Sequence, residues 1–203
     1  MSRKSRQLNQ KKVTVIYCEG ESEKAYFEML SAKYRSGANV HTEKVQIETI
    51  AQSRGADLIE KAARKMARLP RNKQVDQAYV VFDRDNLTQS DLEHCGRVAR
   101  EHQIKIIFSS INFEVWILMH FETVSKAYTG SQLNQRLSGS QYFNQDYSKF
   151  KGRRYDHFLF DRVNFAVVHG QILTNRQDNF WLKSDPYTNV HEVLTDIYGV
   201  TQF

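Results

Sequence analysis

The chain has 203 residues, 40% hydrophobic and 12% aromatic, so it can bury a sizeable core as one domain, with or without an appended subdomain. Gly and Pro are scarce, at 9 and 2 residues, and the sequence has no repeat or low-complexity tract, which excludes a largely disordered or fibrous protein. The formal net charge of +6 favours a polyanionic partner.

Residues 1–12 form a strongly basic segment without any acid, and we expect a flexible basic arm there. This segment lacks the apolar stretch of a secretory signal, and Cys18 and Cys95 form neither a CxxC pair nor a metal-ligand spacing. The longest apolar stretch, around VWILMHF, is much shorter than the roughly 20 residues of a membrane-spanning helix. We therefore expect a cytoplasmic protein.

The first half of the chain alternates between β-branched apolar runs and segments with helical spacing of apolar residues. Strands are expected at 12–18, 43–51, 77–83 and 104–110, separated by helices at 22–34, 56–69 and 89–103. Strands separated by helices of this length form parallel sheets with right-handed crossovers. Residues 13–110 thus indicate an α/β domain.

The second half is mostly helical by the same criteria. Helices are expected at 113–121, 131–137, 156–177 and 190–199, the last after a turn at Pro186 and capped by Thr188 or Asn189. No linker separates the two halves, so residues 111–203 are interpreted as a helical elaboration packed on the sheet.

Acidic residues follow two of the predicted strands. Glu19-Gly20-Glu21-Ser22-Glu23 comes after the first strand, and Asp83-Arg84-Asp85 comes after the third. Sites in open parallel sheets form beyond the carboxyl ends of the strands, so neighbouring first and third strands bring four carboxylates together: Glu19, Glu23, Asp83 and Asp85. Crowded carboxylates repel unless a cation lies between them, and an oxygen-only site favours Mg²⁺ or Mn²⁺.

Glu21 is offset from the face that Glu19 and Glu23 share, and we assign it to the helix dipole at the first turn. Arg84 either faces a phosphate or pairs with a neighbouring carboxylate. Glu114 is an acid in an apolar helix, and two interpretations are open. It can be a further metal ligand, or a hydrogen-bond acceptor behind the metal ligands. It can instead be a buried carboxylate that pairs with a basic residue. Asn112 can cap that helix, and His120 is interpreted as a core histidine.

A second basic run, KFKGRRY, is a candidate nucleic-acid-binding surface, and solvated surface is an equally good interpretation. Its basic residues are Lys149, Lys151, Arg153 and Arg154. The sequence contains no HxxxH zinc spacing, no Walker A loop and no nucleophile elbow, which disfavours zinc binding, ATP hydrolysis and serine-hydrolase chemistry.

Four stretches together resemble a known family: VIYCEGESEKAYF, VVFDRDN, SSINFEVWILMHF and SDPYTNVHEVL. The Glu-Gly pair and the later Asp-x-Asp resemble the Toprim fold of topoisomerases, primases and overcoming-lysogenization-defect nucleases. The four stretches in order are more similar still to RloB-like proteins, which are linked to abortive infection and restriction. The resemblance implies a Toprim-like sheet and a metal site with Glu19 as the first-strand acid, completed by Glu23, Asp83 and Asp85.

We therefore expect a Mg²⁺- or Mn²⁺-dependent nuclease that acts on DNA or RNA in antiphage defence, directed by a partner protein such as an ATPase. Glu19 would serve as general base or acid. One alternative is a nucleic-acid-binding or sensor subunit that keeps the same fold without turnover, and another is a different phosphoryl transfer at the same acids. Fold alone does not decide among these functions.

Overall fold

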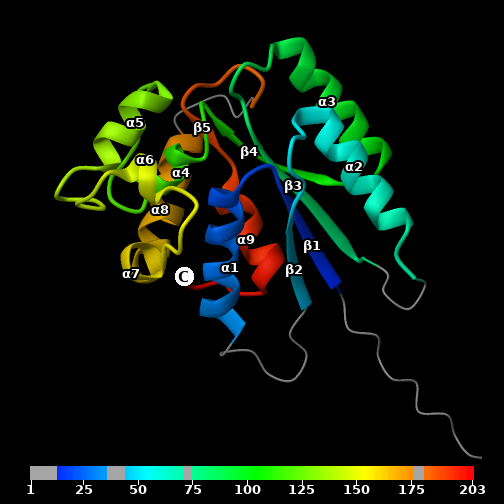
Figure 1. The fold of residues 1–203 in the computed structure, drawn as a ribbon, viewed down its shortest axis with the longest axis horizontal. Coiled ribbons are helices and arrows are strands. Elements are labelled where there is room, and N and C mark those ends of the chain that lie inside the picture. The colour runs from blue at the N-terminus through cyan, green and yellow to red at the C-terminus, as the bar shows by residue number, and fades with distance from the viewer. Residues whose placement is uncertain (1–12, 36–43, 71–74, 176–180) are drawn as a thin grey trace, which may run out of the picture.

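A five-stranded sheet forms the centre of the protein in a computed structural model that describes residues 13–35, 44–70, 75–175 and 181–203 (Figure 1). The predicted basic arm at 1–12 lies outside the described residues. The strands are β1 (Val13–Cys18), β2 (Lys44–Thr49), β3 (Gln77–Asp83), β4 (Lys105–Ser110) and β5 (Tyr187–Thr188). Their order is β2-β1-β3-β4-β5, and only β5 runs antiparallel to its neighbour.

Helices follow the strands as the sequence predicts in the first half: α1 (Glu21–Arg35), α2 (Gly55–Ala67) and α3 (Gln89–Glu101). The second half contains α4 (Glu114–Leu118), α5 (Gly130–Leu137), α6 (Tyr147–Phe150), α7 (Asp156–Leu159), the 3₁₀ turn η2 (Phe160–Arg162), α8 (Val163–Asn175) and α9 (Val190–Tyr198). The expected α/β fold, a mostly parallel sheet flanked by helices with a helical C-terminal region, is confirmed. None of the helices in the described part of the chain combines the length and apolar composition needed to cross a bilayer.

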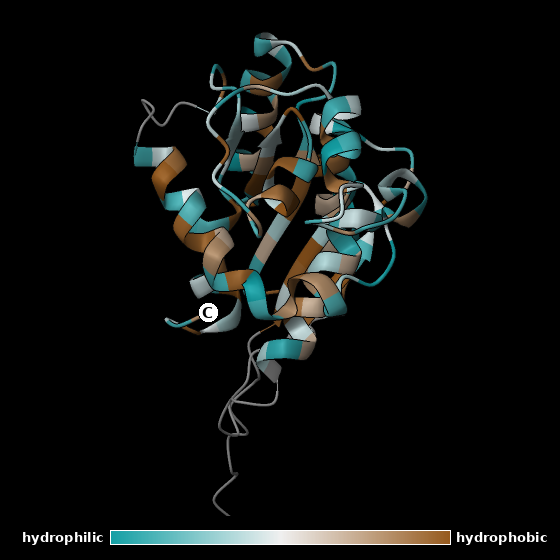
Figure 2. Ribbon diagram, turned by 90° about the vertical axis from the view of Figure 1, so that its left-hand side faces the viewer, coloured by the Kyte–Doolittle hydropathy of each residue, from teal (hydrophilic) through white to brown (hydrophobic). Residues whose placement is uncertain are grey.

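Helices cover both faces of the sheet. Along β1, Ile16 and Cys18 pack into a cluster with α1, α4, α8 and α9, whereas Val15 and Tyr17 pack into a second cluster with α2 and α3. Figure 1 shows α2 and α3 on one side of the strands and α1 and α9 on the other. Because both faces of the sheet are buried, β1 and β3 do not alternate between apolar and polar residues, as in other covered parallel sheets. Many residues of the central strands are accordingly brown, the colour of hydrophobic residues, in Figure 2.

The single helix predicted at 156–177 is wrong within the described residues. The chain forms α7, the turn η2 and then α8. At this break, Lys33 of α1 donates a hydrogen bond to the carbonyl oxygen of Phe160. Residues 176 and 177 lie outside the described residues.

The short strand β5 was not predicted, since Pro186 and its neighbours read as a turn. Ser109 and Ser110 of β4 pair with Thr188 and Tyr187, respectively. Asn189 continues the edge with its side chain: its Oδ1 accepts from the Phe108 N–H at 2.8 Å, and its Nδ2 donates to the Ile106 carbonyl at 3.0 Å. The Asn189 side chain therefore does not cap α9, although that role was expected of it or of Thr188.

His120 is a fully buried core histidine held in its neutral form. Nδ1 lies 3.1 Å from the Trp116 carbonyl oxygen, and Nε2 lies 3.1 Å from the Tyr26 hydroxyl. A ring protonated only on Nδ1 can donate to the carbonyl and accept from the tyrosine. Burial lowers the pKa of His120 from 6.5 to about 3, and the charges of Arg162 and His169 act in the same direction.

We expect His120 to make the protein less stable as the pH falls below 6.5. Between its folded and unfolded pKa values only the unfolded chain takes up the proton, so His120 lowers the free energy of unfolding by up to about 1.4 kcal/mol per pH unit of acidification. His120→Gln keeps one donor and one acceptor but does not titrate. Denaturant unfolding at pH 7, 6, 5 and 4 should show the wild type losing stability relative to this variant. A constant difference at all four values would contradict the assignment.

Candidate functional site

The acids lie at the edge of the sheet where β1 and β3 end side by side. The two strands are parallel, with Cys18 opposite Val81, and the Glu19 N–H continues their pairing by donating to the Val81 carbonyl oxygen at 3.0 Å. β1 is also the point where the strand order reverses, because β2 lies on one side of it and β3 lies on the other. In open α/β sheets this switch point is where ligands usually bind.

Three carboxylates come together at this edge: Glu23 and Glu114 are buried, and Asp83 is partly buried. Glu23, in the first turn of α1, is 6% exposed, and Glu114, at the start of α4, is 0% exposed. Burial raises the pKa of Glu23 to about 7, and the charge of Glu114 acts in the same direction. The pKa of Asp83 is raised well above its usual range by burial and then by the charges of Glu23 and Glu114, although a hydrogen bond with the Phe113 backbone opposes the shift. The charge of Glu114 therefore makes it harder for Glu23 and Asp83 to stay ionised.

Gly20 allows Glu23 to turn toward the strand ends. A Cβ atom at this position would lie 2.9 Å from Glu23 Oε2, closer than such atoms approach in real structures. Any larger residue would displace the carboxylate. The Glu-Gly pair of the sequence therefore has a steric reason, which is that Gly20 leaves room for Glu23 beside Glu19.

Lys151 is the counter-ion of this buried group. Its Nζ lies 3.0 Å from Glu114 Oε1, and the Tyr147 hydroxyl lies 3.5 Å from the same oxygen. Burial works against the charged form of Lys151, but the charges of Glu114, Asp83 and Glu23 outweigh it and raise the pKa of the ammonium group. The site is thus an acidic cluster with its own fixed cation.

Glu19 and Asp85 form the more open side of the site. A hollow of about 80 Å³ is lined by Glu19, Arg54, Asp83, Asp85, Asn86 and Leu87. Burial raises the pKa of Glu19 to about 7, and the charge of Asp85 adds to the shift. Arg54 Nε lies 3.4 Å from Glu19 Oε1, but the arginine side chain is 63% exposed, so this pair is weak. Asp83 lines the hollow and also belongs to the buried cluster.

The donor chemistry of the site fits a hard divalent cation. Glu23 Oε2, Asp83 Oδ1 and Glu114 Oε2 are buried and have no hydrogen-bond partner in the described part of the chain, although nearly all buried polar atoms in proteins have one. Oxygen ligands of this kind suit Mg²⁺ and Mn²⁺. Among the described residues, however, no three His, Cys, Asp or Glu side chains are arranged as a ready-made metal cage. The side chains would have to adjust to surround an ion.

Other predicted site residues are placed differently. Arg84 points away from the acids: its guanidinium donates to Ser110 Oγ at 2.8 Å and to the Trp181 and Leu182 carbonyl oxygens at 3.0 and 3.1 Å. Asn112 does not cap α4, whose N-cap residue is Phe113 without a side-chain cap, and its buried Oδ1 is unpartnered. Neither residue contacts the acidic cluster through any hydrogen bond of the described residues.

Glu21 and the basic run also have local partners. Glu21 is exposed, accepts a hydrogen bond from Thr49 Oγ1 at 2.9 Å and lies 3.6 Å from Lys24, so it is separate from the buried acids. Within the basic run, Lys149 pairs with Asp146 at 3.2 Å and Arg154 with Asp156 at 3.1 Å. The residues proposed to bind nucleic acid are therefore partly neutralised by neighbours, and Lys151 belongs to the acidic site instead.

Comparison with known proteins gives one match. The family model described as RloB-like protein matches residues 14–197, which is most of the chain, so the chain belongs to this family. No curated protein and no solved structure matches.

Proposed function

We propose that this member of the RloB-like protein family is a divalent-metal-dependent nuclease of the Toprim type that cleaves nucleic-acid phosphodiester bonds in antiphage defence. A partner protein such as an ATPase would direct or restrain it. The observation that carries the proposal is the group of buried carboxylates with unpartnered oxygens at the switch point of the sheet. Such a group is costly for the fold unless a ligand offsets its charge.

Four side chains of the chain would hold Mg²⁺ or Mn²⁺: Glu19, Glu23, Asp83 and Asp85. When bound, the ion would polarise the scissile phosphate and lower the pKa of a water molecule. Asp83 is the central ligand in this scheme, because it is close enough to feel the charge of the buried Glu23 and also lines the hollow with Glu19 and Asp85. Glu19, on the open side, is placed to accept or return the proton of the attacking water.

Glu114 and Lys151 would set the charge of the site. The ammonium group of Lys151, 3.0 Å from Glu114, offsets part of the negative charge that would otherwise repel a phosphate. Glu114 is fully buried, so it fixes the position of Lys151 rather than meeting substrate from solvent. The net charge of +6 on the chain would help to attract the polyanion.

A second function is supported by one observation. The acidic side chains of the described residues do not form a ready-made metal cage, which is what a nucleic-acid-binding or sensor subunit without turnover would show. Such a subunit would bind nucleic acid equally well with and without divalent cations. The two functions are therefore separated by a metal-dependent chemical product.

The test is a cleavage panel with single-stranded, duplex and structured substrates of DNA and RNA, including tRNA. We expect Mg²⁺ or Mn²⁺ at millimolar concentration to support cleavage, and we expect removal of the ion with EDTA to abolish it. Each substrate is run with the chain alone and with the products of neighbouring defence genes. If every substrate stays intact in all combinations but binds the chain, the sensor function replaces the nuclease.

A further inference from the structure

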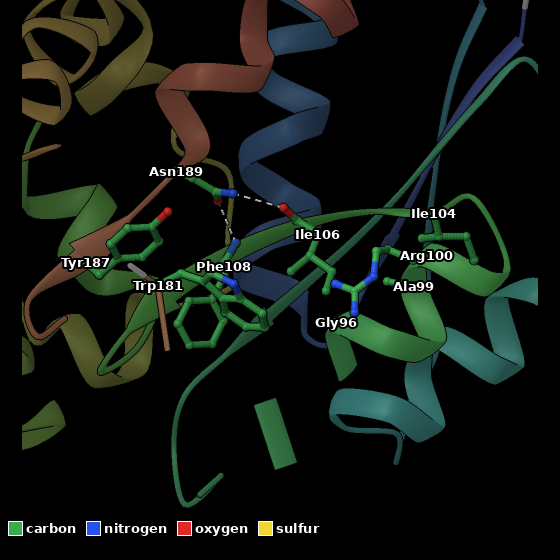
Figure 3. Close-up of a pocket in the computed structure, with 9 residues that line it drawn as sticks. All are labelled: Gly96, Ala99, Arg100, Ile104, Ile106, Phe108, Trp181, Tyr187 and Asn189. Carbon is green, nitrogen blue, oxygen red and sulfur yellow. Dashed lines mark hydrogen bonds between the residues drawn. The ribbon is translucent and has the colours of Figure 1, made fainter. Parts of the chain in front are cut away.

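A groove lies between α3 and the described segment that includes Trp181, with Ile106 and Phe108 of β4 among its lining residues (Figure 3). It consists of two adjoining hollows of about 230 and 330 Å³, which share Gly96, Arg100 and Trp181. The predicted function uses none of these residues. Figure 3 shows Arg100 on the helix side and the rings of Phe108 and Tyr187 on the other.

Aromatic rings form one wall of the groove. Trp181 packs edge-on against Phe108 with ring centroids 5.1 Å apart, and Phe108 lies 6.1 Å from Tyr187. Phe108 and Tyr187 are buried, whereas Trp181 is only partly buried and lines both hollows. A partly exposed indole beside an apolar floor is suited to stacking against a flat ring.

Gly96 keeps the two hollows joined. It lies in the interior of α3, where glycine costs about 1 kcal/mol relative to alanine. A Cβ atom at this position would meet Trp181 Cζ2 and Arg100 Nη1 at 3.5 Å, which is an ordinary contact distance. Packing therefore does not require glycine here, but any larger side chain would fill the floor between Trp181 and Arg100.

Two arginines give the groove a positive charge. Arg97 and Arg100 are exposed on α3, and within the described part of the chain neither guanidinium has a hydrogen bond or an ion pair. Glu93 is the one acid among the lining residues, and its Oε1 accepts a hydrogen bond from Gln89 at 2.9 Å. Unpaired guanidinium groups suit an anion with several oxygens, such as a phosphate.

We propose that this groove binds a nucleotide, with the base against Trp181 and the phosphate at Arg97 and Arg100. The aromatic wall and the unpaired arginines, which Gly96 separates without a side chain of its own, together match a ligand that joins a ring to an anion. The nucleotide is either free in solution or part of a nucleic-acid strand, and both sources present the same chemistry.

The groove is connected to the acidic site through Arg84. This residue lies between Asp83 and Asp85 in the chain, and its guanidinium holds the Trp181 and Leu182 carbonyl oxygens at 3.0 and 3.1 Å. A ligand that shifts the Trp181 wall would therefore act on the residue between two of the proposed metal ligands. This coupling rests on the proposed function, whereas nucleotide binding does not.

Binding is measured with adenosine 5′-monophosphate by calorimetry and by quenching of tryptophan fluorescence. We expect saturable binding by the wild type that is tighter than binding of adenosine or inorganic phosphate alone. Arg100→Gln should weaken it by about ten- to hundredfold, as expected for a lost charged hydrogen bond. Gly96→Leu should abolish it, and Gly96→Ala, which favours the helix, should weaken it without lowering the melting temperature.

Arg68→Gln is the matched control, since Arg68 is an exposed arginine at the end of α2 that does not line the groove. It should bind like the wild type. A second arm uses a 5′-phosphorylated single-stranded hexamer with EDTA present, so that cleavage plays no part. Binding of the hexamer alone, lost in Gly96→Leu and weakened in Arg100→Gln, would assign the groove to a strand nucleotide.

The proposal is overturned if neither probe binds at about millimolar concentration, or if binding is the same in Arg100→Gln, Gly96→Ala and Arg68→Gln. Because the readout is binding without cleavage, its failure leaves the nuclease proposal intact. Conversely, an inactive acidic site would leave nucleotide binding in the groove unaffected.

Discussion

Asp83→Asn is expected to reduce metal-dependent cleavage by more than about a hundredfold, since loss of even an outer partner of a metal ligand typically costs ten- to hundredfold. Asp83 ends β3, is partly buried with its Oδ1 atom fully enclosed, and lies within the electrostatic reach of Glu23, Glu114 and Asp85. Asparagine keeps the size and one oxygen but removes the charge that would bind the cation. The measurement is the initial rate of cleavage of the best substrate in Mn²⁺.

The fold should survive this change. Asparagine removes one of three neighbouring like charges, so the metal-free variant should melt at a temperature no lower than that of the wild type. Asp57→Asn is the matched control, because Asp57 is an exposed acid of α2 that pairs with Lys61 at 2.9 Å, and its cleavage rate should be unchanged. Equal rates for Asp83→Asn and Asp57→Asn would remove Asp83 from the site.

Lys151→Met is expected to have the second-largest effect, on both cleavage and stability. It removes the one ion-pair partner of the fully buried Glu114 in the described residues, so a buried carboxylate is left without a counter-ion there. We expect a loss of about 1–3 kcal/mol in the free energy of unfolding and a strong loss of cleavage. Denaturant unfolding and cleavage rates are measured on the same preparations.

Lys149→Met is the control within the same basic run. Lys149 is 82% exposed and pairs only with the exposed Asp146, so its loss should cost little stability and leave the cleavage rate nearly unchanged. Adding Glu114→Gln to Lys151→Met should restore stability without restoring cleavage, because the unpaired charge is removed but the ammonium group is still absent. If Lys151→Met behaves like Lys149→Met, the cation is surface charge without a role in the site.

Periodicity and strand-end acids in the sequence predicted the first half of the fold and where the candidate site lies. Because β1 and β3 are parallel neighbours, acids that follow them in sequence lie at one edge, and Glu19, Asp83 and Asp85 line the same hollow. The Gly20 position was recognisable as part of a motif, but its steric reason was not. That reason depends on the rotamer of Glu23, which only the folded chain reveals.

The interactions that the sequence did not predict are long-range contacts between side chains and distant segments. Lys151 reads as one of several basic residues in its run, and nothing in that pattern links it to Glu114. Arg84 lies between two acids, yet it binds backbone carbonyls of the segment at Trp181. At the break between α7 and α8, the Phe160 carbonyl oxygen likewise accepts a hydrogen bond from Lys33, which belongs to the first helix. Periodicity reports burial, but it does not report these partners.

The central claim, that the strand-end carboxylates bind a divalent cation, is tested most directly by a crystal grown or soaked with Mn²⁺. An anomalous difference map should show a peak bounded by oxygens of Asp83 and of at least one of Glu19, Glu23 and Asp85. The peak should be absent from an Asp83→Asn crystal treated in the same way. Wild-type crystals that bind Mn²⁺ elsewhere, with these carboxylates left without an ion, would contradict the account.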